Sequence, residues 1–307
     1  MIRIWSPPMP LPTRPRRSAL FMPGDSVRTH RKARSLPVDV VILDLEDATS
    51  PAKKDIARQE VISTLREGGF GHREVVVRVN GLGTPWSDED LEVLATVPLD
   101  AVLLPKVEDA AAVQEMNGRM DALGFPSQVA MWCMLETPLG VLHAERIAAG
   151  GGRLTTLVVG TSDLTKALRA RHTRERTALL SSLSQCLLAG RAHGLTVLDG
   201  VHLDIQDPEG FLDTCRSGRT MGFDGRTLIH PSQIDVCNEQ YAPSAKEIAE
   251  AARIVEAFQE GERAGRGVVV VDGRLIERLH ADEAARTLTL AEQIESRNPT
   301  RAEAGTA

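Results

Sequence analysis

The sequence predicts a closed (β/α)8 barrel. Short apolar runs alternate with longer amphipathic segments between Arg17 and Ala242, a pattern typical of a parallel sheet whose strands are joined by helices. Eight such runs occur, which is the number of strands in this kind of barrel. An open doubly wound sheet is the alternative, but no Gly-x-Gly-x-x-Gly motif follows an early strand, so the closed barrel is favoured.

The strands are predicted where short runs of aliphatic and β-branched residues occur. In chain order these runs are residues 19–22, 40–44, 75–80, 101–105, 129–135, 157–160, 196–198 and 227–229. Helices are predicted between them, where apolar residues recur at helical spacing. The predicted helices are residues 27–35, 53–66, 88–94, 109–123, 142–149, 164–170, 177–193 and 208–218.

A second region begins near Pro243. Ser244 and Glu247 form a capping-box pattern that predicts the start of a long helix. Asp272 and Gly273 predict a hairpin turn between two short strands, and a last helix is expected over residues 281–295. We therefore divide the chain into a flexible extension (1–16), the catalytic barrel (17–242), a C-terminal lid or oligomerisation segment (243–296) and a disordered tail (297–307).

The composition excludes several classes of protein. The formal net charge is −6, so no global positive field favours nucleic acid. No apolar run approaches the length of a membrane span, and the proline-broken N-terminus does not resemble a signal peptide. The four cysteines are scattered without a Cys-x-x-Cys pair, which argues against a zinc site and fits a reducing compartment. We expect a cytoplasmic protein.

Glu136 and Asp163 are the candidate metal ligands. Each comes just past an apolar run, and if the two runs are neighbouring strands, both carboxylates lie at the same rim of the barrel. Two hard oxygen ligands suit Mg²⁺, which keeps open positions for a chelating substrate. Mn²⁺ accepts the same ligands. For Asp163, a role as the N-cap of the next helix stays open, with Ser162 as the other candidate for that cap.

Arg78 is predicted to point into the barrel. Val76 and Arg78 share one face of their strand, and the opposite face is entirely apolar. An inward guanidinium is costly unless it is paired with carboxylates of the protein or of a substrate. One alternative is that Arg78 only neutralises Asp44 or Glu46.

Three acids, Asp44, Glu46 and Asp47, crowd the end of the second predicted strand. Such carboxylates repel one another unless a cation lies near. A solvated loop before the next helix is one interpretation. The other is a supporting role around a metal, which we favour over direct ligation.

Basic residues surround the first strand and helix. Arg17 precedes the strand, and Arg28 and Lys32 lie on the helix. A solvated basic face is one interpretation of these residues. Binding of the phosphates of a CoA thioester is the other.

Several motifs occur in order from the first strand onward. They are Arg17-Ser-x-Leu-Phe-x-Pro-Gly, Lys32-Ala, Val41-Ile-Leu-Asp-Leu-Glu-Asp-Ala, Val77-Arg-Val-Asn, Leu104-Pro-Lys, Glu136-Thr-Pro-x-Gly, Gly160-Thr-Ser-Asp-Leu, Asp199-Gly-Val, Gly222-Phe-Asp-Gly-Arg and Ile229-His-Pro-Ser-Gln-Ile. Together they resemble the citrate lyase β-subunit-like family, which belongs to the phosphoenolpyruvate/pyruvate-domain aldolase superfamily and includes malyl-CoA, β-methylmalyl-CoA and citramalyl-CoA lyases and malyl-CoA thioesterases. The resemblance runs to about Glu292.

The resemblance implies a (β/α)8 barrel in which Glu136 and Asp163 bind Mg²⁺. It implies that Arg78 contacts the acyl oxygens of the substrate. Asp44, Glu46 and Asp47 would hold metal-bound waters.

The resemblance also implies a trimer or hexamer whose C-terminal segment completes a neighbour's active site. The usual acid there is an aspartate in a Gly-Lys-Met-Ile-Asp stretch. This chain has Gly273-Arg-Leu-Ile-Glu instead, so Glu277 stands at that position with a reach one methylene longer. Glu277 would protonate a thioester enolate or remove the methyl proton in the reverse direction.

We therefore predict a Mg²⁺-dependent carbon–carbon lyase that cleaves or forms a short β-hydroxyacyl-CoA, with malyl-CoA as the first candidate. The chemistry expected is a retro-aldol reaction through a thioester enolate that Arg78 stabilises. A malyl-CoA thioesterase and a citryl lyase of the citrate lyase β type are alternatives, and a catalytically silent CoA-ester-binding subunit is a distant one. The expected partners are a CoA thioester, a keto-acid and further copies of this chain.

Overall fold

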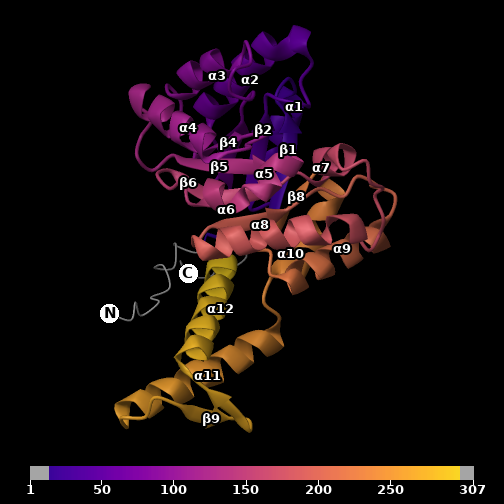
Figure 1. Cartoon of the computed structure of the whole chain (residues 1–307). Helices are drawn as coiled ribbons and strands as arrows, with labels where there is room; N and C mark the ends of the chain where they lie inside the picture. The colour runs from indigo at the N-terminus through magenta and orange to yellow at the C-terminus, as the bar shows by residue number, and fades with distance from the viewer. Residues whose placement is uncertain (1–13, 298–307) are drawn as a thin grey trace. The chain divides into compact units, whose positions relative to one another are not determined.

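The computed structural model describes residues 14–297, and its strands close into a parallel barrel (Figure 1). Each strand pairs with the next along the chain, and β8 pairs with β1 to close the sheet. The strands are β1 (Ser18–Pro23), β2 (Val40–Asp44), β3 (Glu74–Arg78), β4 (Ala101–Leu104), β5 (Ala130–Leu135), β6 (Leu154–Val159), β7 (Thr196–Asp199) and β8 (Gly225–Leu228). The predicted barrel is confirmed.

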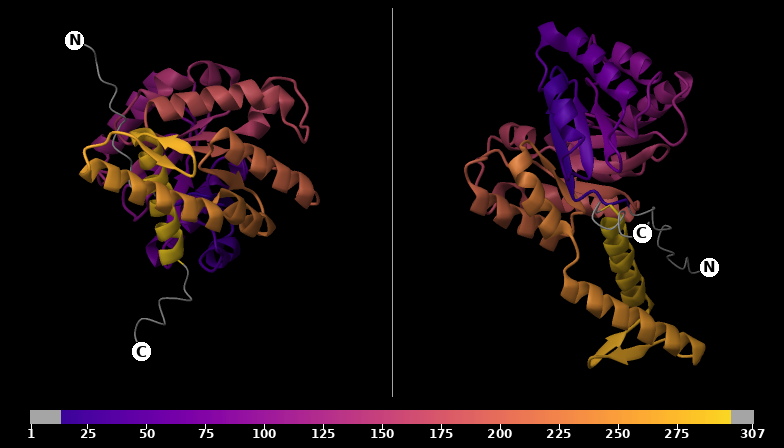
Figure 2. Two further views of the ribbon diagram at one scale, coloured as in Figure 1. Left: turned by 90° about the horizontal axis from the view of Figure 1, so that it is seen from below. Right: turned by 180° about the vertical axis from the view of Figure 1, so that it is seen from behind.

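Helices surround this barrel, as the views in Figures 1 and 2 show. They are α1 (Val27–Ala33), α2 (Lys54–Glu67), α3 (Ser87–Leu94), α4 (Ala110–Ala122), α5 (Pro138–Leu142), α6 (Ala144–Ala148), α7 (Thr161–Ala167), α8 (Leu180–Ala192), α9 (Pro208–Met221) and α10 (Ile234–Tyr241). Short 3-10 turns at Pro51–Lys53, Thr177–Leu179 and Pro231–Gln233 precede α2, α8 and α10. None of the helices in the described part of the chain is long and apolar enough to cross a membrane.

The alternation of side chains along β3 agrees with the predicted parity. Val76 belongs to the apolar cluster inside the barrel, together with Trp132 and Met134 of β5. Val75 and Val77, on the opposite face of β3, are also buried. Arg78 lies two residues after Val76 and shares its face of the strand, so it is directed inward at the carboxyl end of β3, where its Nη1 lies 3.9 Å from the sulfur of Met134.

Arg16 closes the amino end of the barrel. Its guanidinium makes two hydrogen bonds to Glu74, at 2.7 and 2.8 Å, and donates to the hydroxyls of Thr156 and Thr196 at 3.1 and 3.0 Å. It also lies 5.0 Å from the ring centroid of Trp132. The amino end of the barrel is thus occupied by an ion pair between Arg16 and Glu74.

The C-terminal residues from Gln240 onward form a second compact unit. From Ala245 onward it contains α11 (Ala245–Arg263), the antiparallel strands β9 (Val269–Val271) and β10 (Arg274–Ile276), and α12 (Arg278–Ser296). The capping box predicted from Ser244 and Glu247 is present. A small core of Phe258, Val269, Ile276 and Ala281 holds the unit together. Most of the predicted N-terminal extension and C-terminal tail lies outside the described residues.

Candidate active site

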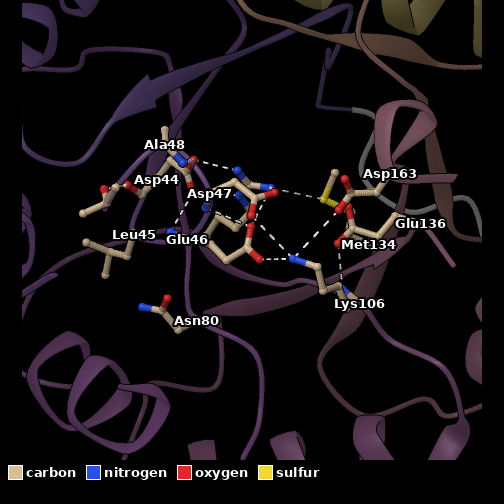
Figure 3. Close-up of polar contacts among 12 residues, drawn as sticks. Asp44, Leu45, Glu46, Asp47, Ala48, Asn80, Lys106, Met134, Glu136 and Asp163 are labelled. Atoms are coloured by element: carbon tan, nitrogen blue, oxygen red, sulfur yellow. Dashed lines mark hydrogen bonds and ion pairs between the residues drawn. The ribbon is translucent and has the colours of Figure 1, made fainter. Parts of the chain in front are cut away.

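Charged side chains gather at the carboxyl ends of consecutive strands of the barrel (Figure 3). The acids that follow β2 lie on one side of this cluster, and Glu136 and Asp163 lie on the other, with the amino group of Lys106 between them. Parallel strands bring their carboxyl ends to one rim, where barrel enzymes place their active sites. The cluster is therefore the candidate active site.

Glu136 is the most deeply buried acid on its side of the cluster. It follows β5 and is 2 % exposed, and its Oε1 accepts a hydrogen bond of 2.8 Å from the backbone N–H of Lys106. Burial raises the pKa of Glu136 to about 7, although nearby Arg78 and Lys106 act in the opposite direction. Because burial disfavours the ionised form of this carboxyl group, a further cation bound beside it would stabilise that form.

Asp163 lies next to Glu136 through the start of α7. The N-cap of α7 is Gly160, which makes no side-chain cap hydrogen bond, so Asp163 sits in the first turn of the helix and the N-cap interpretation is wrong for Asp163 and Ser162. A Cβ at Gly160 would stand 2.6 Å from Oε2 of Glu136. Only glycine permits this close approach, which brings both acids to the same place.

Arg78 forms a bidentate pair with Asp44. Its Nε and Nη2 donate to the two oxygens of Asp44 at 2.7 and 2.6 Å, and its Nη1 lies 3.1 Å from Glu46. Burial alone would lower the pKa of Arg78, but the attraction of Asp44 and Glu46 raises it above its ordinary value. The pairing foreseen as an alternative is therefore present. It leaves Nη1 as the part of the guanidinium not held by Asp44.

Asp44 has a different role from the one implied by the resemblance. Besides Arg78, its two oxygens accept hydrogen bonds from the backbone N–H groups of Glu46 and Ala48, at 2.9 and 3.0 Å. Each oxygen thus carries two donors, which is the usual capacity of a carboxylate oxygen. Asp44 fixes Arg78 and the turn after β2, and it has no lone pair left for a metal-bound water.

Lys106 joins the two sides of the cluster. Its Nζ makes a short contact with Oε1 of Glu46 and lies 3.6 Å from Asp47 and 3.9 Å from Asp163. Its backbone has a left-handed φ of 52°, a conformation that costs a non-glycine residue free energy and often marks a functional site. No role was predicted for Lys106, although the Leu104-Pro-Lys motif at a strand end is a signal for it in the sequence.

The acids after β2 differ in proton affinity. Burial raises the pKa of Glu46 above its ordinary value, against the opposing effects of Arg78 and Lys106. Burial acts in the same direction on Asp47, but hydrogen bonding from Glu46 and the two cations outweigh it, so the pKa of Asp47 is lowered. Neighbouring carboxyls with opposite shifts are a feature of sites that move protons.

The donor set fits a hard divalent cation. Glu136 and Asp163 offer carboxylate oxygens, and the ammonium of Lys106 beside Asp163 shows that positive charge is stable there. No group of three or more His, Cys, Asp or Glu side chains within residues 14–297 is arranged to hold a metal ion. A cation here would have two protein ligands and would complete its shell with water or substrate, as Mg²⁺ commonly does.

Arg17, predicted to bind CoA, is not at this rim. It precedes β1, and its guanidinium pairs with Asp39, just before β2, at 2.8 and 2.9 Å. Both residues are at the amino end of the barrel, so the prediction for Arg17 is wrong. Arg28 and Lys32 are exposed on α1, and their predicted contact with CoA stays a prediction.

Glu277, the predicted acid of the C-terminal segment, is exposed in the second unit. It is the N-cap of α12, and its backbone N–H donates to Nδ1 of His280 at 3.1 Å.

A parallel barrel with a cluster of carboxylates and an arginine at its carboxyl rim has the architecture of a barrel enzyme. Residues 17–231 match the HpcH/HpaI aldolase/citrate lyase family, and the chain belongs to that family. The resemblance inferred from the motifs is thus confirmed, as is the carbon–carbon lyase class at the level of the family.

Curated relatives cover nearly the whole chain. A (3S)-malyl-CoA thioesterase of Cereibacter sphaeroides is 46 % identical over 91 % of this chain and 96 % of its own length. The citrate lyase subunit beta of Escherichia coli is 35 % identical over 91 % of this chain and 94 % of its own.

Among solved structures, CitE of Mycobacterium tuberculosis in complex with magnesium, acetoacetate and coenzyme A is similar, with a TM-score of 0.72 and 34 % identity. That match covers 92 % of this chain and all of the other.

Proposed function

We propose that this protein is a Mg²⁺-dependent enzyme that acts on malyl-CoA or a closely similar β-hydroxyacyl-CoA and hydrolyses its thioester. The observation that carries the proposal is that the buried carboxyl group of Glu136 lies beside Asp163 (Figure 3) and within the electrostatic influence of Arg78. The relative that is 46 % identical and named (3S)-malyl-CoA thioesterase supports the substrate and the reaction. The sequence favoured carbon–carbon cleavage over thioester hydrolysis. We now rank hydrolysis as the first candidate activity and carbon–carbon cleavage as the second.

Glu136 and Asp163 are the residues that would hold Mg²⁺. Bound there, the ion would polarise the hydroxyl and carboxylate oxygens of the substrate. The substrate's thioester carbonyl would then face Nη1 of Arg78, the guanidinium nitrogen not engaged by Asp44. A donor aimed at a developing oxyanion typically contributes about 3–4 kcal/mol to barrier lowering. We assign Arg78 this role.

Glu46 is the candidate general base. Burial raises the pKa of its carboxyl group, and a base acts best when its pKa approaches the working pH. In hydrolysis, Glu46 would take a proton from water as the oxygen attacks the thioester carbon and the CoA thiolate leaves. Asp47, whose pKa is lowered, would stay ionised and hold that water.

Carbon–carbon cleavage is the second candidate. The family and the CitE complex with magnesium, acetoacetate and coenzyme A favour it. The same residues serve this reaction if the base takes the proton of the substrate hydroxyl and Arg78 stabilises the thioester enolate. The two reactions therefore differ in which proton is removed and which bond breaks.

Product identity separates the candidates. The protein would be incubated with malyl-CoA and Mg²⁺, and the products identified by mass spectrometry. Malate and free CoA without glyoxylate would support hydrolysis, whereas glyoxylate and acetyl-CoA would overturn it in favour of the lyase. Absence of both product pairs would overturn the proposed substrate. Glu136→Gln is the matched control for any contaminating activity.

We also propose that the protein is a homo-oligomer in which Glu277 serves the site of a neighbouring subunit, as the family resemblance implies. The inactive variants Glu136→Gln and Glu277→Gln would be co-refolded in equal amounts. If each site combines residues of two subunits, about a quarter of the sites regain both intact acids through random assembly. No regained activity, or a monomeric mass by light scattering, would overturn this arrangement.

A further inference from the structure

Lys54, the first residue of α2, has a buried ammonium group beneath the active-site rim. It is 6 % exposed, and its Nζ donates to the backbone oxygens of Leu45 and Glu46 and to Oδ1 of Asn80, each at 2.7 Å. An ammonium group has three protons, so every proton has an acceptor. Its Nζ also lies 5.2 Å from the ring centroid of Trp86.

Two of these acceptors belong to the turn that carries Glu46 and Asp47. The turn leaves β2 after Asp44, and the N–H of Leu45 still bonds to the carbonyl of Arg78 at 2.9 Å. Beyond that point the carbonyls of Leu45 and Glu46 are held by Lys54. Because the peptide unit is planar, a carbonyl held by a hydrogen bond restrains the backbone torsions beside it. Lys54 therefore restrains the turn from its carbonyl side, while Asp44 holds it through the N–H groups of Glu46 and Ala48.

The third acceptor is itself held in place. The backbone N–H and the amide nitrogen of Asn80 donate to Oδ2 of Asp90 at 3.0 and 2.7 Å, and Arg58 donates to Oδ1 of Asp90 at 2.9 Å. The amide nitrogen is thus turned to Asp90 and the amide oxygen to Lys54. This chain of bonds ties the turn after β2 to the end of β3 and to α3.

We propose that Lys54 is a positioning residue for the reaction, which holds the turn of Glu46 and Asp47 so that both carboxylates face Arg78. The inference rests on the proposed function, because the direction of Glu46 matters to turnover only if the cluster is the active site. Lys54 touches neither Glu136 nor Asp163 through any hydrogen bond of the described residues. Its effect should therefore fall on the chemical step and spare metal binding.

The test compares Lys54→Met with Lys53→Met. Lys53 is adjacent in sequence, but its side chain is 58 % exposed and pairs with Asp25 at 2.8 Å, so it controls for loss of a lysine on this segment. A misplaced catalytic group typically costs on the order of 100-fold. We expect Lys54→Met to lower kcat by roughly 30-fold to 100-fold, with KM and the calorimetric Mg²⁺ affinity within about threefold of wild type.

A double-mutant cycle distinguishes positioning from a merely structural role. If Lys54 acts through Glu46, adding Lys54→Met to Glu46→Gln should lower kcat no further, since the group being positioned is already gone. An equal loss in both backgrounds would overturn the inference, as would a kcat for Lys54→Met within threefold of that for Lys53→Met. The proposed function fails separately, when the wild-type protein shows no Mg²⁺-dependent turnover of malyl-CoA.

A second variant allows the same test if Lys54→Met does not fold. Circular dichroism and the thermal midpoint would establish whether Lys54→Met is folded at the assay temperature. If it is not, Asn80→Ala is used in the same cycle with Glu46→Gln, because it removes one of the three acceptors of Lys54 and leaves the two carbonyl bonds. A smaller loss of kcat that disappears in the Glu46→Gln background is expected. A loss that persists there would overturn the inference.

Discussion

Replacing Glu136 with glutamine should make the metal-free protein more stable while it abolishes turnover. The glutamine keeps a side-chain oxygen to accept the N–H of Lys106, now 2.8 Å from Oε1 of Glu136, and it fills nearly the same volume. It removes a charge from a site that is 2 % exposed. The variant therefore separates the effect of the buried charge on folding stability from its role in turnover.

The magnitude follows from the pKa of Glu136. Burial raises this pKa from 4.5 to about 7, and each pH unit corresponds to about 1.4 kcal/mol, so ionised Glu136 destabilises the folded state by about 3 kcal/mol above pH 7. The folded protein binds the proton more tightly than the unfolded chain does, so this contribution to stability is full below pH 4.5 and is lost as the pH rises through 7. In the variant this dependence on pH is absent.

The assay is urea unfolding in EDTA at pH 5 and pH 8, for wild type and Glu136→Gln. We expect the variant to be more stable by about 2–3 kcal/mol at pH 8 and nearly equal at pH 5. In parallel, Mg²⁺ should stabilise the wild type and leave the variant unchanged. A variant that is less stable at pH 8, or that binds Mg²⁺ as the wild type does, would refute the reasoning.

Three further outcomes are expected. Arg78→Lys should lower kcat/KM by about 100-fold although the charge remains, because the planar fork that pairs with Asp44 is lost; wild-type steady-state kinetics would leave Arg78 as an ion pair only. Lys106→Met should tighten calorimetric Mg²⁺ binding about tenfold, since it removes an ammonium 3.9 Å from Asp163; weaker binding would contradict this. Burial lowers the pKa of His30 below 6.5, so its contribution to stability is present above pH 6.5 and is lost as the pH falls. His30→Gln should therefore lose less stability than wild type between pH 7.5 and pH 5, and equal losses by urea unfolding would exclude His30 as the source.

The barrel and the inward direction of Arg78 could be predicted because both depend on short-range periodicity. Alternation along one strand places Val76 and Arg78 on the same face, whatever the rest of the chain does. The same holds for Glu136 and Asp163, since the ends of neighbouring parallel strands meet at one rim. These predictions succeeded because they depend on periodicity within a strand and on the common direction of parallel strands.

Prediction failed where position depends on which end of a strand a residue occupies or on contacts between distant elements. Arg17 is close to the first helix in sequence, but it stands before β1, and six residues of strand separate the two rims by roughly 20 Å. The left-handed backbone of Lys106 and the three acceptors of Lys54 come from tertiary contacts. No local pattern in the sequence encodes such contacts.

The side chains around Arg16 fill the amino end of the barrel. Because the guanidinium of Arg16 is bonded to Glu74 and packed over Trp132, we expect water and protons to reach Glu136 from the carboxyl rim. A ligand that covers this rim would therefore limit the access of water to the interior. A bound thioester would itself exclude water from the site. Exchange of water at Glu136 should then become slower as a larger fraction of the protein has ligand bound at this rim. Tighter binding would thus also mean better exclusion of water during the reaction.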